Sequence, residues 1–166
     1  YFFDPTPVHL NDIYWRDNNE TSQFWTMAFV PGRRSARQPI YILTSTSTFS
    51  SAEDFCYSLQ NLKRALVVGE TTSGGAHSSR GPQRLTQSFT AIIPVGRSVS
   101  PITKTNWEGT GVTPDIKTSA DASLSVAHLH ALRSLLEMET DRQWKQTLQQ
   151  VADGLSKGGS VPAAQR

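Results

Sequence analysis

The alternation of apolar and polar residues along the chain predicts a mixed α/β protein. Two short runs, residues 40–44 and 65–69, are continuously apolar, which is typical of strands buried on both faces. Between them, residues 50–64 place apolar side chains three and four positions apart, as on one face of a helix. Strand, helix and strand in this order predict a βαβ unit with parallel strands and a right-handed crossover.

Upstream of this unit, the pattern predicts an antiparallel hairpin. Residues 12–16 and 23–30 are rich in aromatic and β-branched side chains, and the residues between them are polar. We expect residues 1–10, which prolines interrupt, to form an entry loop. The basic cluster at residues 32–37 is expected to be a solvated loop.

Downstream of the unit, turn residues dominate and helical periodicity follows. Residues 70–82 and 106–116 are rich in turn formers, and the strand-like segments between them are residues 87–94 and 96–102. From about residue 121 the period becomes helical, with a break near residues 139–141. The predicted apolar stripe of the first helix consists of Leu124, His128, Ala131, Leu135 and Met138, with Leu132 and Leu136 beside it. We expect residues 156–166 to be a flexible tail.

Composition and charge exclude several classes of protein. The chain has 166 residues, 37% of them hydrophobic, which suits one globular domain. A net charge of +2 implies no strong field for nucleic acid or for a membrane surface, and no apolar run is long enough to span a membrane. Cys56 lies on the apolar face of the predicted helix and is expected to pack in the core. The four histidines do not follow metal-ligand spacing, so we expect no metal and no other cofactor.

Ser50 stands at the turn where the first buried strand meets the helix. A serine in this place lies beside unpaired N–H groups and the positive end of the helix dipole, as an acyl-transfer nucleophile requires. The run from Ser50 to Glu53 also fits a capping box, in which the serine hydroxyl bonds an N–H and Glu53 reaches back. Spacing alone leaves both interpretations open, and we expect Glu53 to be a cap or dipole partner.

Three segments resemble the catalytic core of the tail-specific (C-terminal-processing) serine protease family, with the closest similarity to its retinoid-binding-protein-like and tricorn-like branch. They are residues 48–53, 67–75 and 108–116, in the family's order. The resemblance implies a crotonase/Clp-protease-like α/β fold, a spiral of ββα units, followed here by a C-terminal helical segment. It also implies that residues 1–155 form the C-terminal part of a catalytic domain that acts on polypeptides, in the cell envelope or outside the cell.

The resemblance assigns roles to individual residues. It implies that Ser50 is the nucleophile, that the N–H of Ser51 contributes to the oxyanion hole, and that the loop with Gly74 and Gly75 takes part in oxyanion or substrate binding. Many members carry a lysine base followed by a glutamine, but Gly75 and Ser79 occupy those positions here. A serine–lysine dyad at these positions is therefore excluded.

Two alternatives remain for the general base. In tricorn-like members it is a histidine far upstream, which would lie outside this chain, and Glu108 matches the glutamate that completes that site. Alternatively, His77 in the glycine-rich loop acts as the base, because imidazole titrates near neutrality. In the plainer interpretation, His77 is an exposed loop histidine and Glu108 is a turn residue.

These assignments lead to two functional hypotheses. The first is a serine endopeptidase that works through Ser50 and has little activity as this fragment alone. The second is a carrier of apolar ligands such as retinoids or fatty acids, since some members keep the fold without the enzymatic residues. The presence of Ser50 favours the peptidase; a scaffold domain whose serine only caps the helix is the third possibility. The sequence does not indicate an oligomeric state.

Overall fold

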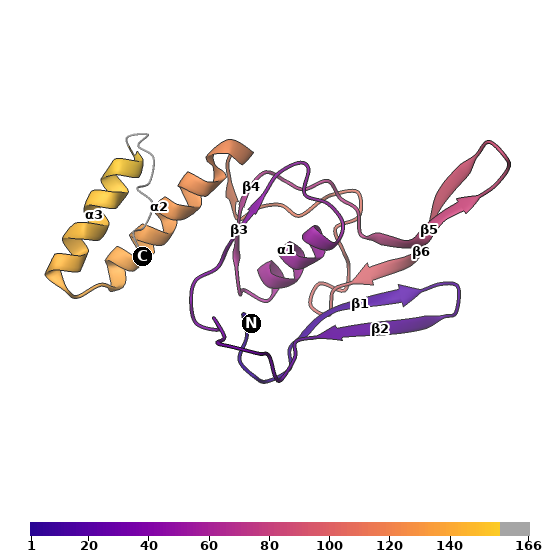
Figure 1. The fold of residues 1–166 in the computed structure, drawn as a ribbon, viewed down its shortest axis with the longest axis horizontal. Coiled ribbons are helices and arrows are strands. Elements are labelled where there is room, and N and C mark those ends of the chain that lie inside the picture. Colours follow the sequence, from indigo (N-terminus) through magenta and orange to yellow (C-terminus); the bar gives the residue numbers. More distant parts are fainter. Residues whose placement is uncertain (157–166) are drawn as a thin grey trace.

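The computed structural model describes residues 1–156, which form two sheets with a helix between them (Figure 1). The first sheet is antiparallel with the order β2-β1-β6-β5, formed by β1 (His9–Trp15), β2 (Glu20–Trp25), β5 (His77–Arg84) and β6 (Thr90–Val99). The second is parallel with the order β3-β4-β7, formed by β3 (Tyr41–Thr44), β4 (Leu66–Gly69) and β7 (Ile116–Lys117). The mixed α/β architecture predicted from the pattern is confirmed. Apart from Ser156, the predicted tail lies outside the described residues.

The predicted βαβ unit is present at the centre of the molecule. Helix α1 (Ser51–Asn61) connects β3 to β4, and the two strands pair in parallel from Tyr41 opposite Leu66 to Thr44 opposite Gly69. The helix and strand β4 supply part of one core cluster, together with residues from two later loops: Cys56, Val67, Ala76, Trp107 and Val112. Cys56 is buried as predicted. Burial raises the pKa of its thiol to about 11, so the side chain is inert.

Helix α1 ends three residues earlier than the pattern predicted. Lys63 has a φ of 56°, which is outside the helical region, and its N–H bonds the Gln60 carbonyl in a tight turn. Arg64 then leaves the helix axis, and its guanidinium donates to the main-chain carbonyls of Phe2, Ser35 and Gln38. These long-range bonds tie the N-terminal segments to the βαβ unit, which local periodicity does not reveal.

The predicted hairpin exists, but its second strand begins and ends earlier in the chain than the pattern predicts. Strand β2 ends at Trp25, and residues 26–30 form a loop instead of a strand. The guanidinium of Arg34 donates to the carbonyls of Phe3, Met27 and Ala28, and thereby holds this loop. The expectation that residues 32–37 form a simple solvated loop is therefore wrong for Arg34.

The segment after β4 contains a strand where a loop was predicted. Strand β5 begins at His77, and its partner β6 runs as one strand through both of the segments predicted separately. The register slips between Ser78 and Pro82, so the ladder accommodates a glycine and a proline. Pairing with β6 supplies the hydrogen bonds that the weak strand propensity of residues 77–84 does not indicate. The β5–β6 hairpin projects away from the body of the molecule (Figure 1).

Two helices complete the described chain, as predicted. They are α2 (Ala120–Met138) and α3 (Arg142–Ser156), and they lie side by side at one end of the molecule (Figure 1). The predicted apolar stripe of α2 is not its buried face, because Leu124 and Met138 are each 67% exposed, but Leu132, expected beside the stripe, is buried. The buried residues of α2 are Ser123, Ala127 and Leu132, and the helix packs on β3, β4 and α3. None of the described helices is both long and apolar enough to cross a bilayer.

Candidate active site

A cleft of about 110 Å³ brings together residues that lie far apart in the sequence. Ser50, Ser51 and Asp54 enter it from the start of α1, and His77 enters from the start of β5. Ile13 of β1 and Trp107 line other parts of the wall. The structure thus places the predicted nucleophile and one of the two predicted bases in one cleft.

The backbone at Ser50 is strained in the manner of a nucleophile turn. Its φ is 57° and its ψ is −121°, a region that costs a residue other than glycine about 1–3 kcal/mol. Ser50 is solvent-exposed. Its carbonyl accepts the N–H groups of Glu53 and Asp54 at 2.9 and 3.0 Å, so the main chain begins the helix. The hydroxyl faces the Glu53 N–H as in a capping box, but without a side-chain hydrogen bond of good geometry.

Ser51 is the first residue of α1, and its N–H has no acceptor among residues 1–156. The first N–H groups of a helix have no partner within the helix and carry the positive end of its dipole. This N–H belongs to the residue directly after Ser50. Ser51 therefore provides an unpaired donor beside the candidate nucleophile, as an oxyanion hole requires.

His77 and Glu108 are neighbours in the structure. The imidazole Nδ1 lies 3.7 Å from Glu108 Oε2, which is within ion-pair range but longer than a hydrogen bond. The same carboxylate oxygen accepts the main-chain N–H groups of Ala76 and His77 at 2.6 and 3.0 Å. These bonds fix Glu108 beside the ring. A histidine whose Nδ1 faces a carboxylate keeps Nε2 available to accept a proton.

Glu53 has a larger structural role than the predicted cap. Its side chain is 0% exposed. The carboxylate accepts the N–H groups of Ser50, Gly74 and Gly75 at 2.9, 2.7 and 2.9 Å, and it also accepts the hydroxyl of Thr72. Burial by itself raises the pKa of Glu53, but the bonds from Thr72 and the three N–H groups outweigh it and hold the pKa below its ordinary value. Glu53 therefore joins the glycine-rich loop to the turn that carries Ser50.

The bonds to Glu53 require a correction of the roles suggested for Gly74 and Gly75. Their N–H groups point at Glu53 and cannot also stabilise an oxyanion. Their carbonyls are also engaged, because Gly74 accepts the Gly109 N–H and Gly75 accepts the Trp107 indole N–H. In this structure, therefore, neither glycine has an unpaired N–H to donate to a peptide strand. Gly75 lines the cleft only as a small residue.

Asp54 is a cleft residue that the sequence interpretation missed. Burial raises the pKa of its carboxyl, and the hydrogen bonds from Ser58 Oγ and Asn11 Nδ2 offset only part of this effect. Within residues 1–156, the Asn11 Oδ1 atom is buried and has no hydrogen-bond partner. The sequence signal that identifies Asp54 as a cleft residue is its position one helical turn after Ser50, since residues i and i+4 lie on one face of a helix.

Comparison with known proteins identifies the family. The sequence model of peptidase family S41 matches residues 9–118. The chain belongs to peptidase family S41. The tail-specific protease family that the motifs predicted is therefore confirmed.

Two solved structures illustrate the shared fold of this S41 chain. It is similar to a photosystem II D1 C-terminal processing protease, with 18% identity and a TM-score of 0.56 over 73% of this chain and 30% of that one. It is also similar to a lipoprotein from Streptococcus agalactiae, with 21% identity and a TM-score of 0.55 over 76% of this chain and 45% of that one. The S41 chain thus spans less than half the length of either protein.

The geometry explains why this S41 chain accommodates no lysine at position 75 without rearrangement. The ring of Phe49 occupies the space that a side chain at Gly75 would need. Because Phe49 directly precedes Ser50, this ring brings the candidate nucleophile's turn into contact with the glycine-rich loop. Among the described residues, no three acidic, histidine or cysteine side chains lie close enough together to hold a metal ion.

Proposed function

We propose that this S41 chain is the C-terminal part of a serine peptidase domain, which hydrolyses peptide bonds through Ser50. In this proposal His77 is the general base and Glu108 orients and stabilises its imidazolium. One observation carries the assignment: Ser50, in a strained strand-to-helix turn, shares a cleft with His77, whose Nδ1 faces Glu108. The long Nδ1–Oε2 distance is compatible with this role, because catalytic contacts are often loose before substrate binds.

The proposed reaction is acyl transfer to serine. The hydroxyl oxygen of Ser50 attacks the peptide carbonyl carbon while His77 Nε2 accepts its proton. Negative charge develops on the carbonyl oxygen, where the Ser51 N–H stabilises it; one such donor contributes about 10²–10³ in rate. The C–N bond then breaks as His77 returns the proton to the leaving amine, and water releases the acyl group by the same steps.

The remaining features of the proposal follow from the family resemblance. Because Ser51 supplies one oxyanion donor and the chain covers less than half of its structural matches, we propose that it has little activity alone. Further sequence would extend the α/β unit into a crotonase-like spiral. The absence of lysine at Gly75 favours the retinoid-binding-protein-like or tricorn-like branch. We also propose a location in the cell envelope or outside the cell.

A fluorophosphonate probe tests the proposal on the longest natural polypeptide that contains this chain. We expect labelling that maps to Ser50, disappears in Ser50→Ala and persists in the control Ser47→Ala. His77→Ala should slow peptide hydrolysis by about 10²–10⁴, the usual contribution of a general base. Labelling that persists in Ser50→Ala would contradict the proposal. Absence of labelling together with tight uptake of a fluorescent fatty acid would instead favour the carrier.

A further inference from the structure

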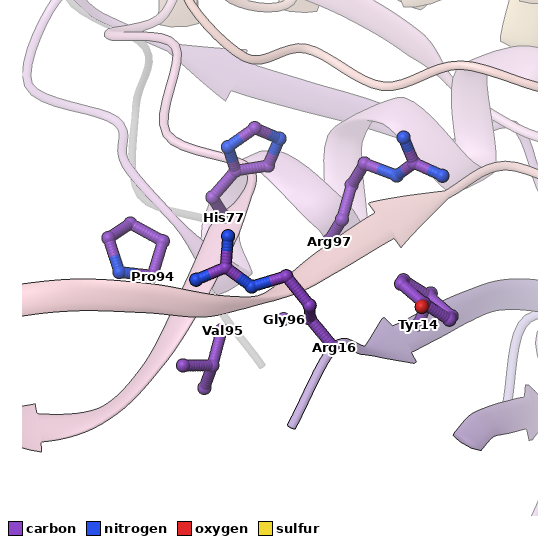
Figure 2. Close-up of a pocket in the computed structure, with 7 residues that line it drawn as sticks. All are labelled: Tyr14, Arg16, His77, Pro94, Val95, Gly96 and Arg97. Atoms are coloured by element: carbon purple, nitrogen blue, oxygen red, sulfur yellow. The ribbon is translucent and has the colours of Figure 1, made fainter. Parts of the chain in front are cut away.

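A second pocket shares His77 with the Ser50 cleft. Figure 2 shows the residues that line this second pocket. Its volume is about 200 Å³, and Tyr14, Arg16, Arg97 and residues 94–96 line the rest of it. Arg16 directly follows β1, and its N–H donates to the Val95 carbonyl at 2.8 Å. The pocket is therefore built on three neighbouring strands of the antiparallel sheet.

The strand register places the polar side chains of this pocket together. Tyr14 of β1 pairs with Arg97 of β6, and Arg97 pairs with His77 of β5. Directly paired residues share one face of a sheet, and Arg16, two positions after Tyr14, continues that face. Figure 2 shows Arg16, Arg97 and His77 on the same side of β6. The Arg97 guanidinium also lies 5.9 Å from the centre of the Tyr14 ring, within cation–π range.

The two arginines of the pocket lack an acidic partner among residues 1–156. The ion pairs found there are His9–Asp12, His77–Glu108 and Arg80–Asp17. Arg80 provides the contrast, because it binds Asp17 at 2.6 Å and lies over the Trp15 ring. Glu108 lies 3.7 Å from His77 Nδ1 and accepts the main-chain N–H groups of residues 76 and 77, but it forms no salt bridge with either arginine. Two guanidinium groups without a salt-bridge partner among residues 1–156 thus lie at one small pocket.

Building on the proposed function, we propose that this pocket binds a carboxylate of the peptide substrate close to the scissile bond. Guanidinium groups bind carboxylates through paired, charge-assisted hydrogen bonds. The volume is below the roughly 300 Å³ at which small-molecule sites begin, which suits one residue of a peptide. Because His77 lines both sites, the carboxylate belongs to a residue one or two positions from the cleaved bond, at about 3.3 Å per residue.

The carboxylate has two possible sources in a peptide: an Asp or Glu side chain, or the C-terminal carboxylate. Peptides that carry Glu or Gln beside the cleavage site and have an amidated C-terminus test the first. The same Gln peptides with a free C-terminus test the second. The protein is the longest natural polypeptide that contains this chain, compared with Arg16→Gln, Arg97→Gln and the control Arg80→Gln.

We expect kcat/KM to be about tenfold or more higher for the peptide with the carboxylate, as one charge-assisted hydrogen bond provides. Arg16→Gln and Arg97→Gln should each reduce that ratio several-fold, whereas Arg80→Gln should retain it. Binding of the same fluorescent peptides to Ser50→Ala gives a readout that needs no catalysis. If Ser50 is labelled but neither carboxylate is preferred, the pocket assignment fails alone. If the peptides bind with the expected preference but Ser50 is not labelled, the peptidase proposal fails alone.

Discussion

Replacing Glu53 by Gln tests whether this carboxylate holds the catalytic turn together. The carboxylate accepts four hydrogen bonds, three of them from main-chain N–H groups. A glutamine keeps one acceptor oxygen and turns an NH₂ group toward donors, which leaves about two buried donors unsatisfied. At about 1–3 kcal/mol for each such donor, Glu53→Gln should lower the free energy of unfolding at pH 7 by about 2–6 kcal/mol. That is a large fraction of the usual 5–15 kcal/mol.

The pH dependence of the free energy of unfolding provides a second, independent test of the role of Glu53. The pKa of Glu53 is lowered in the folded state, so its stabilising effect is fully present above the ordinary glutamate pKa of about 4.5. The effect is lost as the pH falls through the lower folded value. The difference in the free energy of unfolding between wild type and Glu53→Gln should therefore become smaller as the pH falls below about 4.5. Urea unfolding followed by tryptophan fluorescence measures it, since Trp107 is 2% exposed.

The exposed Glu20 provides the matched control. Glu20→Gln should change the free energy of unfolding by no more than about 0.5 kcal/mol, as is usual for a surface position. A Glu53→Gln protein that unfolds within the same 0.5 kcal/mol of wild type at pH 7 would refute the reasoning. It would mean that the glycine-rich loop is held by other contacts.

Two further substitutions test the local geometry. Gly75→Ala should lower the free energy of unfolding by less than about 1 kcal/mol, because the Phe49 ring that the new methyl group meets is 57% exposed and can move. Gly111→Ala should lower it by more than about 2 kcal/mol, since the φ of Gly111 is 71° and a side chain there would meet the Thr72 carbonyl. Equal thermal midpoints would contradict this difference. Asp54→Asn should raise the thermal denaturation midpoint at pH 7. The folded wild type loses stability as the pH rises through the raised pKa of Asp54, and the uncharged asparagine avoids this loss. A lower midpoint would show that the charged form is needed.

The local pattern was sufficient wherever neighbouring residues decide the structure. The βαβ unit follows from two apolar runs and a helical period, and both strands and the helix are present. Ser50 was recognised because a strand-to-helix turn is a short-range feature. The resemblance predicts roles for His77 and Glu108, which are 31 residues apart in the chain. Their contact, in contrast, is seen only in the structure.

Long-range pairing decided what the pattern missed. Strand β5 exists because β6 pairs with it, although its own residues favour a loop. The inward face of α2 is set by the close approach of β3 and β4, which selects Ser123 and Ala127 over the larger Leu124. In both cases the partner surface overrides the preference of the segment itself.

The sequence by itself determined the family, the central α/β unit and the position of the candidate nucleophile, because these depend on residue order over short distances. Only the tertiary structure decided that Glu53 occupies the N–H groups of Gly74 and Gly75. It also decided that Arg16 and Arg97, 81 positions apart in the chain, line one pocket. The physical reason is that strand register and the packing of distant segments decide which donor meets which acceptor and which charges lie close together. Local residue spacing does not carry this information.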